Sequence, residues 1–365
     1  MGDDLSQRRR SSVESAILVG THALDELREL AKSAGARVID EVVQRRERPD
    51  PSTFIGKGKV EELREQALLE GVDVIIFDDD LSPSQAKNLE EAIETKIVDR
   101  TGLILDIFAR RARTKEGKLQ VELAQLEYRL TRLTGYRAYL SRLGGGIGTR
   151  GPGETKLEMD RRQIRHRIST LKRDIEQMRK HRQLHRERRR KDQLPLVSLV
   201  GYTNAGKSTL FRALSKEDTL ISSRLFSTLD TLIRRIQLGK NFPILISDTV
   251  GFIRKLPHQL VSAFRATLEE VVEADLILHV VDVSDPERVE KEQVVLEVLK
   301  EIGAGDHPML TVYNKADLLE SRVASAGSSD DVLPDFEGLL VSALTGEGLD
   351  RLISQIVGHV SPVRV

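Results

Sequence analysis

The fold of the C-terminal half is decided by one stretch, which reads Gly201-Tyr202-Thr203-Asn204-Ala205-Gly206-Lys207-Ser208. It directly follows an apolar run, Leu196–Val200, and a helical pattern opens at Thr209. A glycine-rich turn between a strand and a helix lets backbone N–H groups close around phosphate oxygens at the helix N-terminus. In such a loop Lys207 can neutralise phosphate charge, and the hydroxyl of Ser208 can bind magnesium. The stretch therefore predicts a phosphate-binding loop over residues 201–209, but it does not distinguish ATP from GTP.

A second motif, Asp248-Thr249-Val250-Gly251, follows the apolar run Ile244–Ser247. An Asp at the end of a strand suits a magnesium-bound water, and the Gly permits the backbone to approach a γ-phosphate. Because this motif comes after the phosphate loop and at a strand end, we expect residues 248–251 to form a switch segment of the same site.

Two further motifs select the base. Asn314-Lys315-Ala316-Asp317 follows the run Met309–Tyr313, and Ser342-Ala343-Leu344 follows Leu339–Val341. The carboxylate of Asp317 can accept hydrogen bonds from guanine N1 and N2, whereas adenine would leave it unpaired and desolvated. The second motif is typical of the loop whose backbone N–H meets guanine O6. Together they favour GTP.

The remaining switch stretch is Phe226-Ser227-Thr228-Leu229-Asp230-Thr231. We expect Thr228, with Thr231 as the alternative, to close on magnesium and the γ-phosphate. The predicted magnesium ligands are then Ser208, Thr228 and, through a water, Asp248.

Phe252 stands where Ras-like enzymes place a Gln that orients the attacking water. Phenylalanine cannot do this, so the water must be held by another group, a partner or an ion. Asn204 has two interpretations: it helps to bind a potassium ion beside the phosphates, or it caps the turn of the loop.

The N-terminal part alternates short apolar runs with helical patterns, which indicates a parallel sheet covered by helices. The runs are 16–19, 37–43, 74–77 and 97–98, and the helical patterns are 22–33, 57–70 and 84–93.

Residues 116–191 instead show two heptad seams. The first comprises Leu119, Leu123, Leu126, Leu130, Leu133 and Leu140, and the second comprises Leu157, Ile164, Ile168, Leu171, Ile175 and Met178. This pattern predicts an antiparallel coiled-coil hairpin. The alternative is a pair of amphipathic helices that pack on a neighbouring domain.

The joining loop, Gly144–Glu154, is rich in glycine and holds a Pro-Gly step, so we expect it to lack regular structure. It is either a contact surface at the tip of a stalk or a flexible connector. The second arm is strongly basic, since residues 161–191 contain 14 Lys or Arg and three acids. Such a helix suits a phosphate backbone, although mixed charge is also usual for a solvated face. The expected RNA contacts are Arg150, Gly151, Pro152, Gly153, Glu154, Arg188, Arg189 and Arg190.

Composition limits the other possibilities. The 57 basic and 57 acidic residues cancel in net charge, which hides the basic arm. There is no Cys, so disulfides and thiolate metal sites are excluded. No apolar run approaches the length of a membrane span, and we expect a cytoplasmic monomer. The expected organisation is a disordered tail (1–12), an α/β domain (13–112), the hairpin (113–192) and a Ras-like P-loop GTPase domain (193–365).

These motifs, in this order, resemble the HflX family of ribosome-associated GTPases. The resemblance also rests on Phe54–Val60, Arg100–Phe108, Gly151–Thr155 and the hydrophobic Phe252. One departure is Thr231, where many relatives place Pro, and this could alter the stiffness of the switch loop.

The resemblance implies a GTP hydrolase that uses Mg²⁺, binds the large ribosomal subunit and splits stalled or idle ribosomes in its GTP state. It also implies that the hairpin enters the ribosome, which stimulates a low intrinsic activity. Some relatives are credited with ATP binding by the N-terminal domain, for which Gly56–Lys59 could touch phosphate; the alternative there is a turn before a helix. The residues themselves fit two other functions equally well, a GTP-gated RNA remodeller and a GTPase partner of an RNA-modifying enzyme.

Overall fold

The computed structural model describes residues 13–46, 48–143, 152–191, 194–216, 225–226, 228–229, 232–239, 242–255, 268–319 and 338–361. Within these ranges the side chains of 134–143, 152–157 and 181–191 are not described. The expected tail, 1–12, lies outside the described residues. The chain forms two compact units, one of residues 1–110 and 119–174, the other of residues 111–118 and 175–365.

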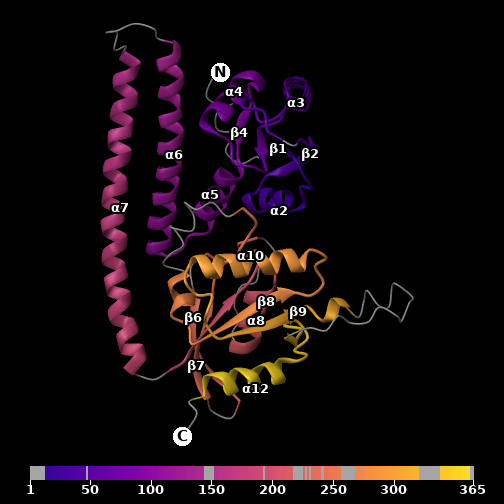
Figure 1. The fold of residues 1–365 in the computed structure, drawn as a ribbon, viewed down its shortest axis with the longest axis vertical. Helices are drawn as coiled ribbons and strands as arrows, with labels where there is room; N and C mark the ends of the chain where they lie inside the picture. The colour runs from indigo at the N-terminus through magenta and orange to yellow at the C-terminus, as the bar shows by residue number, and fades with distance from the viewer. Residues whose placement is uncertain are drawn as a thin grey trace, which may run out of the picture. The chain divides into compact units, whose positions relative to one another are not determined.

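The first unit contains a four-stranded parallel sheet in the order β2-β1-β3-β4 (Figure 1). Its elements are β1 (Ser15–Gly20), α2 (Asp25–Ala34), β2 (Arg37–Val43), α3 (Lys57–Glu70), β3 (Val74–Phe77), α4 (Pro83–Ile93), β4 (Lys96–Val98) and α5 (Arg100–Arg111). The sheet is parallel, as the alternation predicted. Helix α2 begins three residues later than its pattern suggested, and α5 was not expected as a helix.

Side chains alternate between the faces of this sheet. Ile17, Val19, Ile75 and Phe77 pack in one core with residues of α3 and α4. Helix α4 begins with a complete capping box, because Ser82 accepts from the Gln85 N–H and the Gln85 side chain accepts from the Ser82 N–H.

Two long helices follow, α6 (Lys115–Leu143) and α7 (Pro152–Lys191), and they lie side by side in Figure 1. Arg167 pairs with Glu122 at 2.7 Å and Lys172 with Glu127 at 2.8 Å. Ile168 and Leu171 are buried, as their seam positions require. Heptad packing along the whole hairpin stays a prediction.

Helix α6 has a second buried face, which packs on the N-terminal sheet rather than on α7. Val121 and Ala124 are buried, and Tyr128 and Arg132 both bind Asp99, the residue that follows β4. Asp99 also caps α5, since it accepts from the Gly102 N–H at 2.9 Å. The hairpin is thus mounted directly on the first sheet.

The expectation for the tip was wrong at one end. Residues 144–151 lie outside the described residues, but Pro152, Gly153 and Glu154 already belong to α7. Proline suits the first turn of a helix, where its missing N–H has no partner to lose.

The second unit holds a six-stranded sheet in the order β10-β9-β8-β5-β7-β6. Its elements are β5 (Leu196–Val200), α8 (Lys207–Ser215), β6 (Leu232–Leu238), β7 (Phe242–Asp248), β8 (Leu276–Asp282), α10 (Arg288–Glu301), β9 (Met309–Asn314), β10 (Leu339–Leu340) and α12 (Leu349–Val360). All strands are parallel except β6, which the sequence pattern did not reveal and which pairs antiparallel with β7.

Helices cover both faces of this sheet. Leu210 and Phe211 of α8 share one core with Leu352 and Ile356 of α12, and Figure 1 shows α10 on the opposite side of the sheet from α12. The loops that carry the sequence motifs therefore meet at the carboxyl ends of β5, β7 and β9. Among the described helices, none is long and apolar enough to cross a membrane.

Candidate functional site

The loop after β5 has the backbone geometry that its glycines allow. Gly201 has φ 155°, and a Cβ there would lie 2.2 Å from the Val280 carbonyl oxygen. Gly206 has φ 92°, and a Cβ there would lie 2.2 Å from Nδ2 of Asn314. Asn204 is exposed with φ 64°. Its side chain makes no hydrogen bond with the described residues, so the turn-capping interpretation gains no support.

Lys207 begins α8 and is buried beneath the loop. Its Nζ donates to the carbonyl oxygens of Gly201 at 2.9 Å and Tyr202 at 2.8 Å. Burial lowers the pKa of Lys207 to about 8, and the Asp248 carboxylate opposes this shift. An anion in the loop would favour the charged form of Lys207.

The three residues expected to bind magnesium meet in space. Ser208 Oγ donates to Asp248 Oδ2 at 2.7 Å, Thr228 Oγ1 donates to the same oxygen at 2.9 Å, and the two hydroxyls are 2.9 Å apart. The other carboxylate oxygen, Asp248 Oδ1, is buried without a hydrogen-bond partner. Burial raises the pKa of Asp248. Two hydroxyls and a carboxylate are hard oxygen donors, so these residues fit Mg²⁺.

Residues 248–252 lie against the phosphate loop. A Cβ on Gly251 would come within 2.8 Å of Thr203 Cα and 3.0 Å of Lys207 Nζ, so this close approach needs glycine. The Thr249 hydroxyl donates to the Leu199 carbonyl at 2.6 Å, and Val250 is buried. Phe252 is 1% exposed, and its ring is therefore in the core rather than at the phosphate side.

The two base motifs are tied to the phosphate loop through Asn314. Its Nδ2 donates to the Ala205 carbonyl at 3.0 Å, and its Oδ1 accepts from the Ala343 N–H at 2.9 Å. The sequence suggested Asn314 as a guanine ligand and did not reveal this bridge between loops.

The groups expected at the guanine lie around this bridge. Lys315 Nζ pairs with Asp282 at 2.5 Å, and Ser342 Oγ donates to Asp317 Oδ1 at 2.5 Å. The second contact holds the base-reading carboxylate, and the Ser342 side chain was missed as its support. The Leu344 side chain is 79% exposed.

Of the other expected site residues, Thr209 lies in α8 and Phe226 is buried with φ 55°. Ser227, Asp230 and Thr231 lie outside the described residues, so the choice between Thr228 and Thr231 rests on Thr228 alone.

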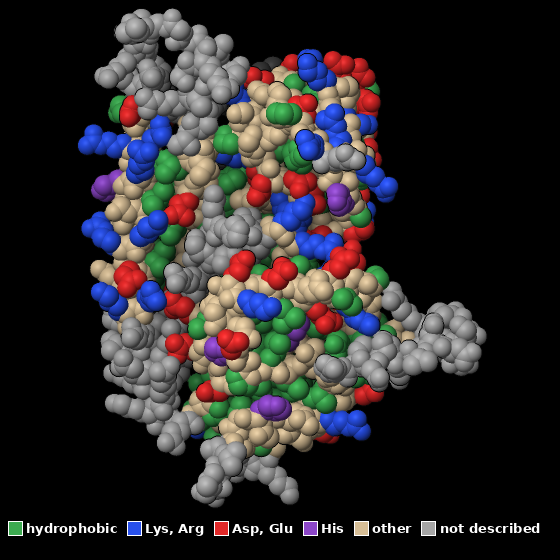
Figure 2. All heavy atoms as spheres, in the orientation of Figure 1, with side chains coloured by type: hydrophobic (Ala, Val, Ile, Leu, Met, Phe, Trp, Pro, Cys, Tyr) green, Lys and Arg blue, Asp and Glu red, His purple; other side chains and the backbone are tan. Residues whose placement is uncertain are grey.

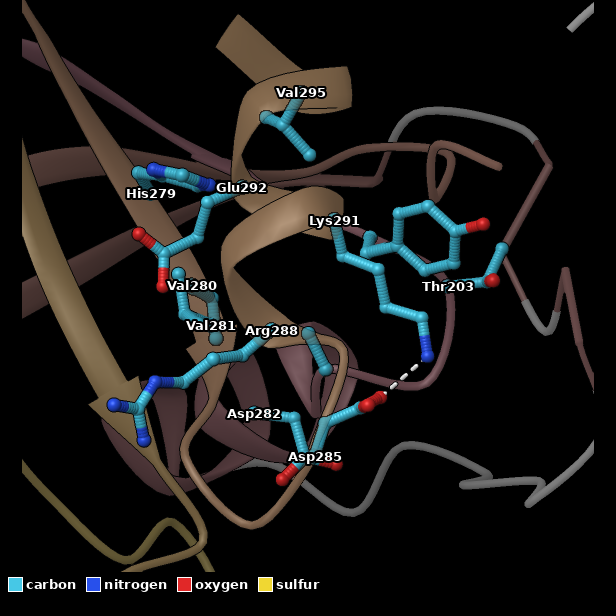
Figure 3. A pocket seen from close by; sticks show the side chains of 12 residues that line it. Thr203, His279, Val280, Val281, Asp282, Asp285, Arg288, Lys291, Glu292 and Val295 are labelled. Carbon is cyan, nitrogen blue, oxygen red and sulfur yellow. Dashed lines mark hydrogen bonds and ion pairs between the residues drawn. The ribbon is translucent and has the colours of Figure 1, made fainter. Parts of the chain in front are cut away.

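A pocket lies behind the loop, between β8 and α10 (Figure 3). Its lining includes Tyr202, Thr203, His279, Lys291, Glu292 and Val295. His279 is 2% exposed, and burial, reinforced by Lys207, lowers its pKa to about 4. The imidazole is therefore neutral, as the wall of a nucleotide site full of cationic charge would require.

The expected RNA contacts fall largely outside the described part. Arg150 and Gly151 are not described, and Arg188, Arg189 and Arg190 lie in α7 without described side chains. On the described part of α7, Figure 2 shows Lys and Arg side chains along the helix. The exposed basic residues there are Arg162, Arg165, Arg167, Lys172, Arg173, Arg179 and Lys180.

Three family models match successive parts of the chain. One described as "GTP-binding GTPase N-terminal" matches residues 21–109, and one described as "GTP-binding GTPase Middle Region" matches residues 111–189. A third, described as "50S ribosome-binding GTPase", matches residues 196–315.

Curated relatives match nearly the full chain. A protein named GTPase HflX from Caldanaerobacter subterraneus subsp. tengcongensis is 51% identical over 363 residues, which cover 98% of this chain and 82% of the relative. GTPase HflX from Escherichia coli (strain K12) is 46% identical over 93% of this chain and 79% of its own length. Among solved structures, the crystal structure of SsGBP in complex with GDP matches 97% of this chain and 100% of its own, with 25% identity and a TM-score of 0.51.

Proposed function

The chain belongs to the HflX family of GTPases, and from that premise we propose that it binds the large ribosomal subunit and, loaded with GTP, dissociates stalled or idle ribosomes. GTP binding and hydrolysis follow from the family and the fold. The ribosomal partner is supported by the family model described as a 50S ribosome-binding GTPase. It is also supported by the basic surface of α7. Because ribosomes work there, the cytoplasm is part of the proposal.

The observation that carries the nucleotide chemistry is the meeting of Ser208, Thr228 and Asp248. Mg²⁺ would be held by the two hydroxyls and, through a water, by the carboxylate, and it supplies charge neutralisation at the β- and γ-phosphates. Lys207 would move its three donors from backbone carbonyls to phosphate oxygens. The N–H groups of residues 203–208 would cradle the phosphates, and Gly251 would bind the γ-phosphate.

The guanine would be read by Asp317, which Ser342 orients. The backbone of residues 343–344 would meet guanine O6, and Asn314 would hold the base loop against the phosphate loop. A potassium ion beside the phosphates, bound with help from Asn204, is the finer part of this proposal. It is supported by the exposed, unpaired amide and by the absence of Gln at position 252.

The hairpin would be the ribosome-facing element, with domains at 13–112, 113–192 and 193–365. The three family models, whose matches change near residues 110 and 190, support these boundaries. The tip, Arg150–Glu154, would enter an irregular RNA cavity, and Arg188–Arg190 would bind phosphates and set affinity.

Sedimentation with ribosomes tests the partner. Protein loaded with a GTP analogue should sediment with large subunits, whereas GDP-loaded and nucleotide-free protein should stay in the supernatant. Equal sedimentation with any RNA, whatever the nucleotide, would instead support the RNA remodeller.

Hydrolysis assays test the missing Gln. Turnover should be slow in the free protein and should rise on addition of ribosomes, because completion of such sites in trans is worth roughly 10³–10⁵-fold. Potassium should support the reaction better than sodium. Fast turnover without response to ribosomes would contradict the proposal.

A tip variant tests the effector. Replacing Gly151–Glu154 by a short Gly-Ser turn should spare GTP binding and abolish splitting, measured by light scattering of whole ribosomes. Neutralising Arg188, Arg189 and Arg190 is the matched control, since it should weaken binding and reduce its salt dependence. Normal splitting by the tip variant would reduce the tip to a connector.

A further inference from the structure

The second residue of the phosphate loop, Tyr202, does more than present its backbone. Its side chain is 7% exposed, and its hydroxyl accepts the backbone N–H of Arg254 at 2.8 Å. Arg254 lies three residues beyond Gly251. A side chain of the phosphate loop therefore holds the chain just after the switch motif.

Two backbone bonds extend this contact. The Thr203 N–H donates to the Phe252 carbonyl at 2.7 Å, and the Phe252 N–H donates to the Gly201 carbonyl at 3.1 Å. Tyr202 and Phe252 thus face each other in a short parallel bridge. With the tyrosine bond, three hydrogen bonds fasten residues 252–254 to residues 201–203.

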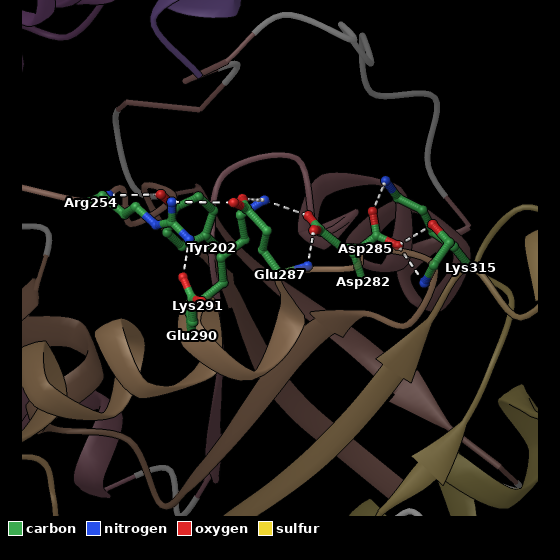
Figure 4. A network of polar contacts seen from close by, with 9 residues as sticks. Tyr202, Arg254, Asp282, Asp285, Glu287, Glu290, Lys291 and Lys315 are labelled. Carbon is green, nitrogen blue, oxygen red and sulfur yellow. Dashed lines mark hydrogen bonds and ion pairs between the residues drawn. The ribbon is translucent and has the colours of Figure 1, made fainter. Parts of the chain in front are cut away.

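The tyrosine ring is itself held by α10. Lys291 Nζ lies 5.4 Å from the centre of the ring, within the range of a cation–π contact. The same ammonium pairs with Asp285 at 2.6 Å and Glu287 at 3.3 Å. Arg254 pairs with Glu287 and with Glu290, at 3.4 and 2.5 Å. Figure 4 shows this network, in which both partners of the Tyr202 hydrogen bond reach the first turns of α10.

The consequence concerns Gly251. This residue approaches Lys207 Nζ and Thr203 so closely that its backbone has one place to be. Its neighbours up to Arg254 are held by the bonds to residues 201–203, so a shift of Gly251 away from the phosphates must break them. A hydrogen bond held in position before the substrate arrives costs no reorganisation during the reaction.

We propose that Tyr202 is a positioning residue of GTP hydrolysis: its hydroxyl, braced by Lys291, fixes residues 251–254 where the Gly251 N–H meets a γ-phosphate. The inference rests on GTP hydrolysis at this site and does not depend on the ribosome. It predicts selectivity for the triphosphate state, because GDP has no γ-phosphate for Gly251 to meet.

The test is Tyr202→Phe in the full chain, which removes only the hydroxyl and keeps the ring under Lys291. Turnover should fall about fivefold, the value of one net hydrogen bond. Affinity for a non-hydrolysable GTP analogue should fall by about the same factor, and affinity for GDP should stay within about twofold. Equal loss of analogue and GDP affinity, or unchanged turnover, would overturn the proposal.

Tyr128→Phe is the matched control, because it also removes one tyrosine hydroxyl bond, to Asp99 at 2.6 Å in the other unit. It should leave turnover by the free protein unchanged, and an equal loss in both variants would reduce Tyr202 to a stabilising role. Lys291→Met should show the Tyr202→Phe pattern more weakly, about twofold.

Amide hydrogen exchange needs no variant and covers the case in which Tyr202→Phe does not fold. In the analogue-bound wild type, the Arg254 amide should exchange slowly, and in the GDP-bound form faster. Exchange of this amide at the unprotected rate in the analogue state would also overturn the proposal. Wild-type protein without any GTP turnover would refute the proposed function instead.

Discussion

Both sheets end in a buried aspartate at the carboxyl edge, and the two residues have opposite surroundings. Asp99, after β4, accepts from Tyr128 at 2.6 Å, Arg132 at 2.5 Å, and the N–H groups of Gly102 and Leu81 at 2.9 and 3.3 Å. Both of its oxygens are thereby used. Asp248, at the end of β7, has two hydroxyls on one oxygen and no hydrogen-bond partner on the other.

The difference separates a joint from a ligand site. A buried carboxylate whose oxygens are all satisfied by its own chain contributes to folding and has nothing left to offer a ligand. One with an unpaired buried oxygen costs stability until something binds it. The same architecture thus uses one aspartate to mount the hairpin and the other to hold the nucleotide's metal.

Removing the joint should have the largest effect. Asp99→Ala leaves the Arg132 guanidinium, the Tyr128 hydroxyl and two N–H groups without their acceptor. We expect a loss of about 3–5 kcal/mol in unfolding free energy, measured by denaturant titration followed by helix content. Asp106→Asn, an exposed acid on the same helix, should not lower stability. GTP affinity should be unchanged, and a joint without energetic value would show in equal stabilities of the two variants.

Asp248→Asn should do the reverse. Turnover should fall roughly 10²–10³-fold, because an amide cannot supply the charge that holds Mg²⁺ and its water. Nucleotide-free stability should not decrease, since the variant removes a buried carboxylate that burial disfavours. Steady-state hydrolysis and thermal unfolding without nucleotide are the measurements. A destabilised apo protein with normal turnover would exchange the roles of the two aspartates.

Asp317→Asn sharpens the comparison at the base. GTP affinity should fall by ~1–3 kcal/mol, because an acceptor facing the guanine N–H groups becomes a donor. Xanthosine triphosphate should bind better than in the wild type, since its O2 accepts that donor. Fluorescence titration with both nucleotides decides this, and unchanged GTP affinity would reject Asp317 as the base reader.

Ser342→Ala should have the smallest effect. It removes the donor to Asp317 and the acceptor of the Thr345 N–H at 3.1 Å. We expect GTP affinity to fall by about 1 kcal/mol with no change in preference over xanthosine triphosphate, because the carboxylate remains. A larger loss than in Asp317→Asn would mean that Ser342 meets the nucleotide itself.

Local pattern predicted most of the fold because most strands here are apolar runs. Residues 37–43, 74–77 and 196–200 form strands with the bounds expected from their composition. Strand β6 was missed because its sequence, Leu232–Leu238, places two arginines in a half-exposed edge strand. Helix α5 was missed because it begins two residues after β4, with a buried cap that only the fold supplies.

The site divides in the same way. Residues that touch phosphate, metal or base are confined to short motifs, and their spacing predicted that Ser208, Thr228 and Asp248 would share one ion. Residues that hold those motifs are spread along the chain. The Asn314 bridge joins residues 205 and 343, and the Tyr202 bond joins 202 and 254, so no local pattern could reveal either.

Phe252 carries a consequence for how this enzyme can evolve. Its backbone is bridged to Tyr202 and its ring is enclosed by the core. A glutamine at this position would inherit the same bridge and direct its amide inward, where an unpaired amide costs roughly 1–3 kcal/mol. Reversion at this one position would therefore lower fitness through stability before it could raise the rate. The lineage is committed to an external timer for hydrolysis, and selection on that rate must act elsewhere in the chain or on the molecule that sets it.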